Sequence, residues 1–240
     1  MKTIILTGDS RGLGNQICET LLKEGYKVIG ISRKESERTK NLKTKYKEKY
    51  KHINYDLSQS EQIKELYLNQ LKKEGPIYGL INNAAIAYDE ITTNAKIEPL
   101  EKMYKINVIT TIMLTKYIIR DMLLNEIKGS IVNITSVCAH TGYKGLSMYA
   151  STKGAIEAFS KTVAREFGSK KIRSNCVAPG FMETDMSNSL KKEQKNRIYK
   201  RTSLKEATNI ESVSKTVEFL LKDESFSITG QVIHVDNGTI

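Results

Sequence analysis

Short apolar runs alternate with helix-length segments along the chain, and this alternation constrains the fold more than any other feature. The seven runs are Thr3–Thr7, Lys27–Ser32, His52–Asp56, Gly79–Asn82, Ser130–Thr135, Ser174–Ala178 and Val232–Val235. Strands separated by helices pair in parallel, because each connection must cross over the sheet, and the crossing helices cover its faces. The sequence therefore predicts an α/β fold, a doubly wound parallel sheet of about seven strands with helices on both faces. Ligands of such sheets bind at the carboxyl ends of the strands.

Two helices are marked by their apolar spacing and by the glycines that follow them. Leu13–Glu24 is followed by Gly25, and Met148–Phe167 is followed by Gly168. Glycine in that position is typical of a helix C-terminus. The polar, lysine-rich segment at residues 181–207 comes after a Pro-Gly pair and predicts an excursion from the sheet. We expect this excursion to act as a mobile lid over the ligand.

Composition is that of a soluble globular protein, with 39% hydrophobic and 27% charged residues. No stretch approaches the roughly 20 apolar residues that a membrane helix needs, and the N-terminus lacks a signal-peptide pattern. No repeat or proline-rich linker divides residues 1–240, so we expect one domain. We also expect a cytoplasmic protein that does not bind membranes.

The cysteines and histidines favour neither disulfides nor a metal. Cys18, Cys138 and Cys176 are widely spaced and odd in number, which is typical of buried thiols in a reducing compartment. The three histidines have no spacing with cysteines or carboxylates that would build a zinc site. The sequence therefore predicts no metal, and any cofactor must be organic.

The formal net charge of +11 has two interpretations. The basic stretch at residues 38–51 alternates with apolar side chains much as a solvated helix face does. A basic surface also attracts anions, so an acidic carrier protein or a phosphorylated cofactor remains the alternative. No nucleic-acid-binding module accompanies the charge, and we expect no nucleic-acid partner.

A glycine-rich turn directly follows the first predicted strand. Gly8, Gly12 and Gly14 let the backbone turn sharply and bring the N-terminus of the next helix close to a pyrophosphate. The strand before the turn and the helix after it make this pattern more specific than three glycines alone. The candidate cofactor-binding residues of the turn are Gly8, Ser10, Arg11, Gly12, Leu13 and Gly14.

The end of the second predicted strand favours NADP over NAD. A carboxylate there would bind the adenosine ribose and repel a 2′-phosphate, but the strand ends at Arg33. Arg33 and Arg11 offer forked donors that suit a phosphate. In the alternative interpretation the arginines are surface charges, and Glu35 or Glu37 binds the ribose. We expect NADPH/NADP+.

The strongest catalytic signal is Tyr149 followed four residues later by Lys153. Residues four apart share one face of a helix. A tyrosine has a pKa of about 10, and a nearby ammonium group stabilises the phenolate and lowers that pKa. Ser136, thirteen residues before Tyr149, ends a predicted strand and can donate to a substrate oxygen there. Together these residues predict a general acid and a group that polarises a carbonyl.

A serine-hydrolase interpretation would pair Ser136 with His140. It fits poorly, because no Gly-x-Ser-x-Gly elbow surrounds this serine. Cys138 lies two residues beyond it, and we interpret Cys138 as a packed thiol.

The Gly-x-x-x-Gly-x-Gly spacing, Ser136 and the Tyr149/Lys153 pair resemble the short-chain dehydrogenase/reductase family over essentially the whole chain. That resemblance implies a Rossmann-like fold and a fourth catalytic member, Asn107, which would hold a water that links Lys153 to solvent. It also implies that Lys153 contacts the nicotinamide ribose and that Tyr149 protonates the ketone oxygen while hydride arrives from NADPH.

Further cofactor contacts are implied by the same resemblance. They are Asp56 and Leu57 at the adenine ring, Asn83 and Ala84 after the fourth strand, Tyr149 and Lys153 themselves, and Pro179, Gly180 and Thr184 on the nicotinamide side. Ala85 departs from the family, which usually has glycine there, so the local fit beside the cofactor is open.

Within the family the chain most resembles the 3-oxoacyl-[acyl-carrier-protein] reductases, through residues 160–166, 177–186 and 228–236. This implies a ketone substrate on an acyl carrier protein, a role in fatty acid biosynthesis and a homotetramer or homodimer. Lys128, Lys170 and Lys171 are expected near the site mouth, where they would attract the acidic carrier. Residues 87–99 do not resemble those reductases. The alternatives are therefore a reductase of a free small-molecule ketone, sugar or polyol, and a non-catalytic NADP-binding regulator.

Overall fold

The computed structural model describes residues 1–184 and 191–240 and contains one seven-stranded parallel sheet. The strands lie in the order β3-β2-β1-β4-β5-β6-β7. Their bounds are β1 Thr3–Thr7, β2 Lys27–Ser32, β3 Tyr50–Asn54, β4 Ile77–Asn82, β5 Ser130–Ile134, β6 Arg173–Pro179 and β7 Val232–Val235. The predicted fold class is confirmed.

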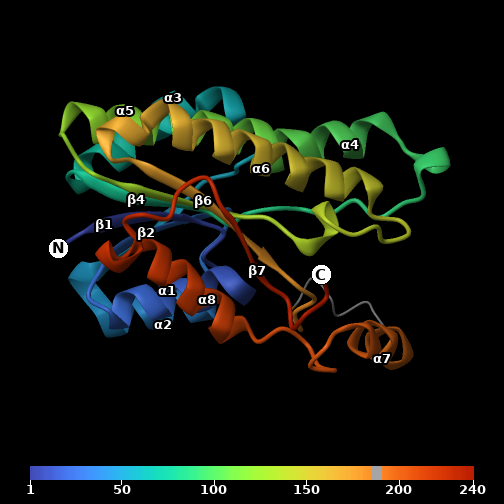
Figure 1. Cartoon of the computed structure of the whole chain (residues 1–240). Coiled ribbons are helices and arrows are strands. Elements are labelled where there is room, and N and C mark those ends of the chain that lie inside the picture. The colour runs from blue at the N-terminus through green and yellow to red at the C-terminus, as the bar shows by residue number, and fades with distance from the viewer. Residues whose placement is uncertain (185–190) are drawn as a thin grey trace.

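Helices cover both faces of the sheet (Figure 1). The helices are α1 Gly12–Lys23, α2 Glu37–Tyr46, α3 Ile63–Leu66, α4 Ile97–Tyr104, α5 Thr111–Leu124, α6 Ser147–Phe167, α7 Lys192–Arg201 and α8 Ile210–Leu221. Figure 1 shows α1, α2 and α8 on one face and α3, α5 and α6 on the other. No helix within residues 1–184 and 191–240 is long and apolar enough to span a membrane.

The apolar residues of the strands are divided between two cores, one on each face. In β1, Ile4 and Leu6 pack into the core under α1 and α8, whereas Ile5 packs into the core under α5. All three side chains are fully buried. Successive side chains of a strand point to opposite faces. A strand covered on both sides must therefore be apolar throughout, as the sequence of β1 is.

The strand order reverses its direction between β1 and β4. From β1 the chain adds β2 and β3 on one side, and it then returns to add β4 to β7 on the other. This topology opens a crevice at the carboxyl ends of β1 and β4, where α/β sheets bind their ligands. The segments that leave the two strands at this edge begin with Gly8 and Asn83.

The two glycines predicted to end helices, Gly25 and Gly168, have different backbone conformations. Gly25 has φ 86°, and Tyr26 N–H donates to Leu21 O at 3.1 Å, so a left-handed glycine closes α1 as predicted. Gly168 instead has φ −59° and begins a 3₁₀ turn. The left-handed residue after α6 is Lys171, with φ 61°.

The excursion between β6 and β7 carries α7, which lies beyond the carboxyl edge of the sheet (Figure 1). It is tied back by Ser203 N–H, which donates to Gly238 O at 3.1 Å, and by the Phe181 and Tyr199 rings, whose centroids are 5.9 Å apart. The chain between β6 and α8 is thus held to the C-terminal residues. Residues 185–190 of the predicted lid lie outside the described residues, and its motion stays a prediction.

The three lysines expected at the site mouth lie elsewhere. Lys128 comes two residues before β5, and Lys170 and Lys171 come just before β6. These positions are at the amino edge of the parallel sheet, and the ligand crevice is at the opposite edge. The prediction that they surround this chain's own site is wrong, because it ignored which end of a strand each loop joins.

Candidate active site

The glycine-rich turn forms an open cradle between β1 and α1. A Cβ atom on Gly14 would lie 2.0 Å from Gly8 O, so only glycine allows the helix to start this close to the strand. A Cβ on Gly12 would lie in ordinary van der Waals contact with Thr184, at 3.7 Å. Arg11 is the N-cap residue of α1, and its side chain makes no capping hydrogen bond. The first N–H groups of the helix are therefore free to bind an anion.

Thr7 braces this turn, although the sequence patterns did not identify it. Its Oγ1 accepts hydrogen bonds from the N–H groups of Asn83 and Ala84, both at 3.0 Å. Asn83 Nδ2 donates to Thr7 O at 2.9 Å and to Gly8 O at 3.2 Å. The predicted cofactor residue Asn83 therefore holds the glycine-rich turn, and a hydroxyl directly before the first glycine was the missed signal.

A groove of ≈ 350 Å³ extends from the glycine-rich turn toward the excursion. Its lining residues are Gly12, Asn15, Gln16, Arg38, Glu183, Thr184, Lys195 and Ile210. Pro179 ends β6 beside this region, and Gly180 N–H donates to Val235 O at 2.9 Å. The structure thus brings Thr184 to the glycine-rich turn, and Pro179 and Gly180 to the same edge of the sheet.

Charges at the end of β2 favour the arginine interpretation. Arg33 and Arg11 are exposed and form no salt bridge or side-chain hydrogen bond within the described part of the chain. Glu35 instead pairs with Lys43 at 3.5 Å, and Glu37 pairs with Lys40 at 2.7 Å. Each acid of the alternative interpretation thus has a lysine partner, whereas the arginines have no such partner and remain available to a phosphate.

The predicted adenine contacts follow β3. The N–H of Ser58 donates to Asp56 Oδ1 at 2.9 Å and lowers the pKa of Asp56. Leu57 is buried, and its carbonyl accepts a hydrogen bond from Thr110 Oγ1 at 2.6 Å. These contacts fix the loop that borders the crevice beyond β2.

Asn107 lies in a π-helical turn, Lys105–Thr110, between α4 and α5. Its side chain is buried, accepts from Ile86 N at 2.9 Å and donates to Ile86 O at 2.9 Å. It also donates to Thr152 Oγ1 at 3.1 Å, one residue before Lys153. Asn107 therefore ties the chain beyond Ala85 to α6, while its predicted water stays a prediction.

Lys153 joins Tyr149 to the carboxyl end of β5, the strand that Ser136 follows. Lys153 Nζ donates to Ile134 O at 2.8 Å, two residues before Ser136. The same Nζ lies 5.5 Å from the centroid of the Tyr149 ring. The hydroxyl of Ser136 accepts from Cys138 N–H at 3.2 Å, and its own proton can be given to another acceptor.

Burial dominates the electrostatics of this pair. It lowers the pKa of Lys153 to about 8 and raises the pKa of Tyr149 above its usual range, with smaller contributions from Cys138 and Asp89. The lowering of the Tyr149 pKa by Lys153 is not seen in the ligand-free chain and stays a prediction for the bound state. A tyrosine that keeps its proton at neutral pH is suited to act as an acid.

The structure does not support the serine-hydrolase alternative, because His140, its candidate base, faces Glu157. His140 Nε2 lies 3.0 Å from Glu157 Oε1, and its ring packs edge-on against His234 with centroids 4.4 Å apart. Cys138 is partly buried, and burial raises the pKa of its thiol. Neither residue activates Ser136. Within the described ranges no cluster of three His, Cys, Asp or Glu side chains could hold a metal.

Comparisons with known proteins agree with this geometry. A family model described as enoyl-(acyl carrier protein) reductase matches residues 8–239. The 3-oxoacyl-[acyl-carrier-protein] reductase FabG of Salmonella typhimurium is 32% identical over 237 residues, which cover 99% of this chain and 96% of the relative. The L-xylulose reductase of Caenorhabditis elegans is 32% identical over 241 residues, with 99% and 95% coverage.

Solved structures also show a similar fold. The structure titled "ElxO with NADP Bound" superimposes with a TM-score of 0.90 at 30% sequence identity, covering 99% of this chain and 98% of that one. The similarity extends over the whole sheet and both helical layers, because almost every residue of each chain is included.

Proposed function

The chain belongs to the short-chain dehydrogenase/reductase family, and from that premise we propose that it reduces a ketone to a secondary alcohol with NADPH. The observation that carries this proposal is that Lys153 contacts both the carbonyl of Ile134, at the end of β5, and the ring of Tyr149, while Asn107 bonds to the neighbouring Thr152. Binding of NADP in a relative of 30% identity supports the choice of cofactor. So do the unpaired guanidinium groups of Arg11 and Arg33 in the described chain.

The residues present fit such a cofactor. Gly14 lets α1 begin directly against the Gly8 carbonyl, and the uncapped start of α1 offers N–H groups to phosphates. Bound NADPH would supply the hydride to the carbonyl carbon. Asp56, Leu57 and Ala84 would border the adenosine half, and Pro179, Gly180 and Thr184 the nicotinamide half.

The protein's own residues would donate the proton that the carbonyl oxygen receives and would then replace it. Ser136 donates a hydrogen bond to the carbonyl oxygen and polarises it. Tyr149 gives its phenolic proton to that oxygen, which balances the hydride that the carbon receives. The Lys153 ammonium stabilises the resulting phenolate and returns a proton to it, and a water held near Asn107 connects Lys153 to solvent.

For the substrate we propose a 3-oxoacyl thioester on an acyl carrier protein. The names of the FabG relatives support this substrate. The charge of α7 adds a physical reason. That helix has five basic residues, Lys192, Lys195, Arg197, Lys200 and Arg201, against the single acid Glu193. It lies beyond the carboxyl edge of the sheet (Figure 1). A basic helix there would steer an acidic carrier toward the site. With this substrate we also propose that the protein acts in fatty acid biosynthesis, that it is cytoplasmic, and that it forms a homotetramer or homodimer.

A free polar ketone is the second candidate. The L-xylulose reductase relative is as similar to this chain as FabG is. Asp89, an exposed acid on the loop after β4, contributes to the raised pKa of Tyr149 and therefore lies near its phenol. A carboxylate in this position suits a substrate with hydroxyl groups better than an acyl chain.

The test is NADPH oxidation with an acetoacetyl thioester on acyl carrier protein, the neutral acetoacetyl-N-acetylcysteamine thioester, and a panel of free ketones and ketoses. We expect activity with both thioesters and a clear preference for NADPH over NADH. Activity on a ketose alone would replace the substrate proposal with the second candidate. Binding of NADPH without turnover of any ketone would support a non-catalytic regulator instead.

A further inference from the structure

A buried polar cluster lies beneath the glycine-rich turn, on the face of the sheet that α1 and α2 cover. The side chains of Asp9 and His52 are 0% and 2% exposed. Asp9 Oδ2 accepts a hydrogen bond from Tyr50 Oη at 2.6 Å and contacts His52 Nδ1 at 2.8 Å. This cluster joins the residue directly after Gly8 to β3, the edge strand of the sheet.

Gly30 on β2 makes room for the cluster. A Cβ atom on Gly30 would lie 1.8 Å from Asp9 Oδ2. In the register of the sheet Gly30 is paired with His52, so the Asp9 side chain passes over β2 to reach β3. The backbone of the turn is fixed as well, because Asn15 Nδ2 donates to Asp9 O at 3.2 Å and Ser36 Oγ donates to Ser10 O at 2.7 Å.

The partners of His52 favour its charged form. Nδ1 faces the Asp9 carboxylate, and Nε2 lies 3.0 Å from the amide oxygen of Asn54. With the Asn54 amide in this orientation both partners are acceptors, and only the imidazolium can donate from both ring nitrogens. Burial opposes this charge, but the hydrogen bond and the charge of Asp9 outweigh it, and the pKa of His52 is raised above its ordinary value of 6.5.

Four other titratable groups belong to the surroundings of this pair. The Cys18 thiol of α1 has a pKa raised well above its usual value, and the Tyr50 phenol is raised as well, so both are neutral. Glu35, before α2, adds to the raised pKa of His52 and is paired with Lys43 of α2 at 3.5 Å. His52 is therefore the cation in direct contact with Asp9.

We propose that His52 is a positioning residue for the cofactor, whose charge neutralises Asp9 and thereby lets the glycine-rich turn hold the anionic phosphates of NADPH. Asp9 lies between Gly8 and Ser10 in that turn, and its carboxylate is fully buried. Water and salt screen a buried charge poorly. With a neutral His52, the Asp9 charge would repel the phosphates from inside the turn. The inference rests on the proposed cofactor.

The pair should link cofactor affinity to pH. Anion binding favours the protonated form of His52, so the affinity for NADPH should fall as the pH rises through the His52 pKa. Phosphate monoesters have a second pKa near 6 and are already fully ionised from pH 7 to 9. Lys153 also titrates in this window, with a pKa of about 8, so the effect of the pair is the difference between the wild type and a variant that lacks both charges of the pair. The same sign holds for folding: stability from the pair is fully present below pH 6.5 and is lost as the pH rises through the folded-state pKa.

The experiment measures the Kd of NADPH from its fluorescence at several pH values from 7 to 9. The variants are His52→Asn, which keeps a neutral N–H toward Asp9, and the double variant Asp9→Asn/His52→Asn, which removes both charges. His234→Asn, an exposed histidine on β7, is the control. Thermal unfolding of each variant verifies that it is folded.

We expect the wild type and the His234 control to lose affinity by about tenfold across the window, within the range of typical couplings between sites. At pH 7, His52→Asn should bind about tenfold more weakly, and the double variant should regain most of the affinity with a pH profile shallower than that of the wild type. A wild-type profile no steeper than that of the double variant, or an unchanged Kd in His52→Asn, would overturn the proposal. If His52→Asn does not fold, the comparison of the pH profiles of the wild type and the double variant still tests the proposal. Absence of NADPH binding in the wild type would refute the proposed function instead.

Discussion

Lys153 carries the clearest pH signature of the individual residues. Burial lowers its pKa to about 8, and in the proposed mechanism its ammonium form stabilises the phenolate of Tyr149. With NADPH saturating, we therefore expect kcat for ketone reduction to fall as the pH rises through about 8. The measurement is a kcat profile from pH 6 to 10. Cys138→Ala should keep the same profile, because that thiol is the other titrating group beside Ser136. A kcat that stays constant to pH 10 would contradict this role of Lys153.

Residues with a fixed spacing were predictable, and residues that pair across the sheet were not. Tyr149 and Lys153 share a helix, so their proximity follows from the four-residue interval. Asp9 and His52 are brought together only by the register of β2 and β3, and no local pattern encodes that register. Thr7 was missed for the same reason, since its partners follow β4.

The glycine-rich turn and α6 give a matched pair of glycine substitutions at the scale of elements. Gly14→Ala places a Cβ atom 2.0 Å from Gly8 O, and we expect it to destabilise the fold by about 1–3 kcal/mol, as overpacking does. Gly154→Ala, inside α6, meets nothing within 4 Å and should stabilise by about 0.5–1 kcal/mol. Urea unfolding measures both. Equal effects of the two substitutions would show that the close approach at Gly14 is not rigid.

Most elements were predictable from the chain because apolar runs and helix-ending glycines are local signals. β3 was the exception: it runs from Tyr50 to Asn54, two residues earlier than predicted. An edge strand is buried on fewer sides, so Lys51 and Asn54 are exposed within it and its apolar pattern is weak. The misplaced lysines before β5 and β6 show a related difficulty, since position in the sequence does not reveal which edge of the sheet a loop joins.

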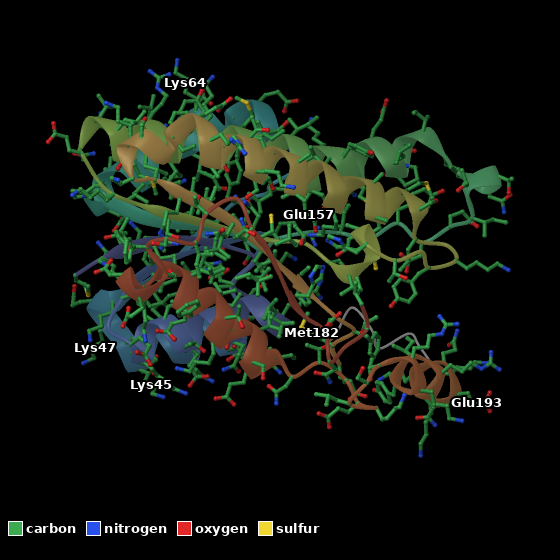
Figure 2. The ribbon with its side chains drawn as sticks, in the orientation of Figure 1. Lys45, Lys47, Lys64, Glu157, Met182 and Glu193 are labelled. Carbon is green, nitrogen blue, oxygen red and sulfur yellow. The ribbon has the colours of Figure 1, made fainter. Side chains whose placement is uncertain are left out.

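At the scale of the whole molecule, the basic α7 should decide how a carrier protein approaches. We expect Arg197→Glu/Lys200→Glu to raise KM for the carrier-bound thioester by about tenfold, because opposite charges steer association. KM for the neutral N-acetylcysteamine thioester should not change. The control is Lys45→Glu/Lys64→Glu, the same change of charge on α2 and α3, away from α7 (Figure 2). An equal rise in KM for both thioesters would mean that α7 acts on the site itself and not on the carrier.

The role of Tyr149 as proton donor is the claim on which the mechanism depends. Its direct test is NADPH oxidation by Tyr149→Phe, together with the Kd of NADPH, using as control Tyr78→Phe, whose hydroxyl bonds to Leu221 O at 2.7 Å far from the site. Loss of a general acid costs about 10²–10⁴-fold in rate. We predict a fall of at least about 100-fold in kcat for Tyr149→Phe, with the Kd of NADPH unchanged within about twofold. A Tyr149→Phe variant that reduces the ketone at the wild-type rate would contradict the account.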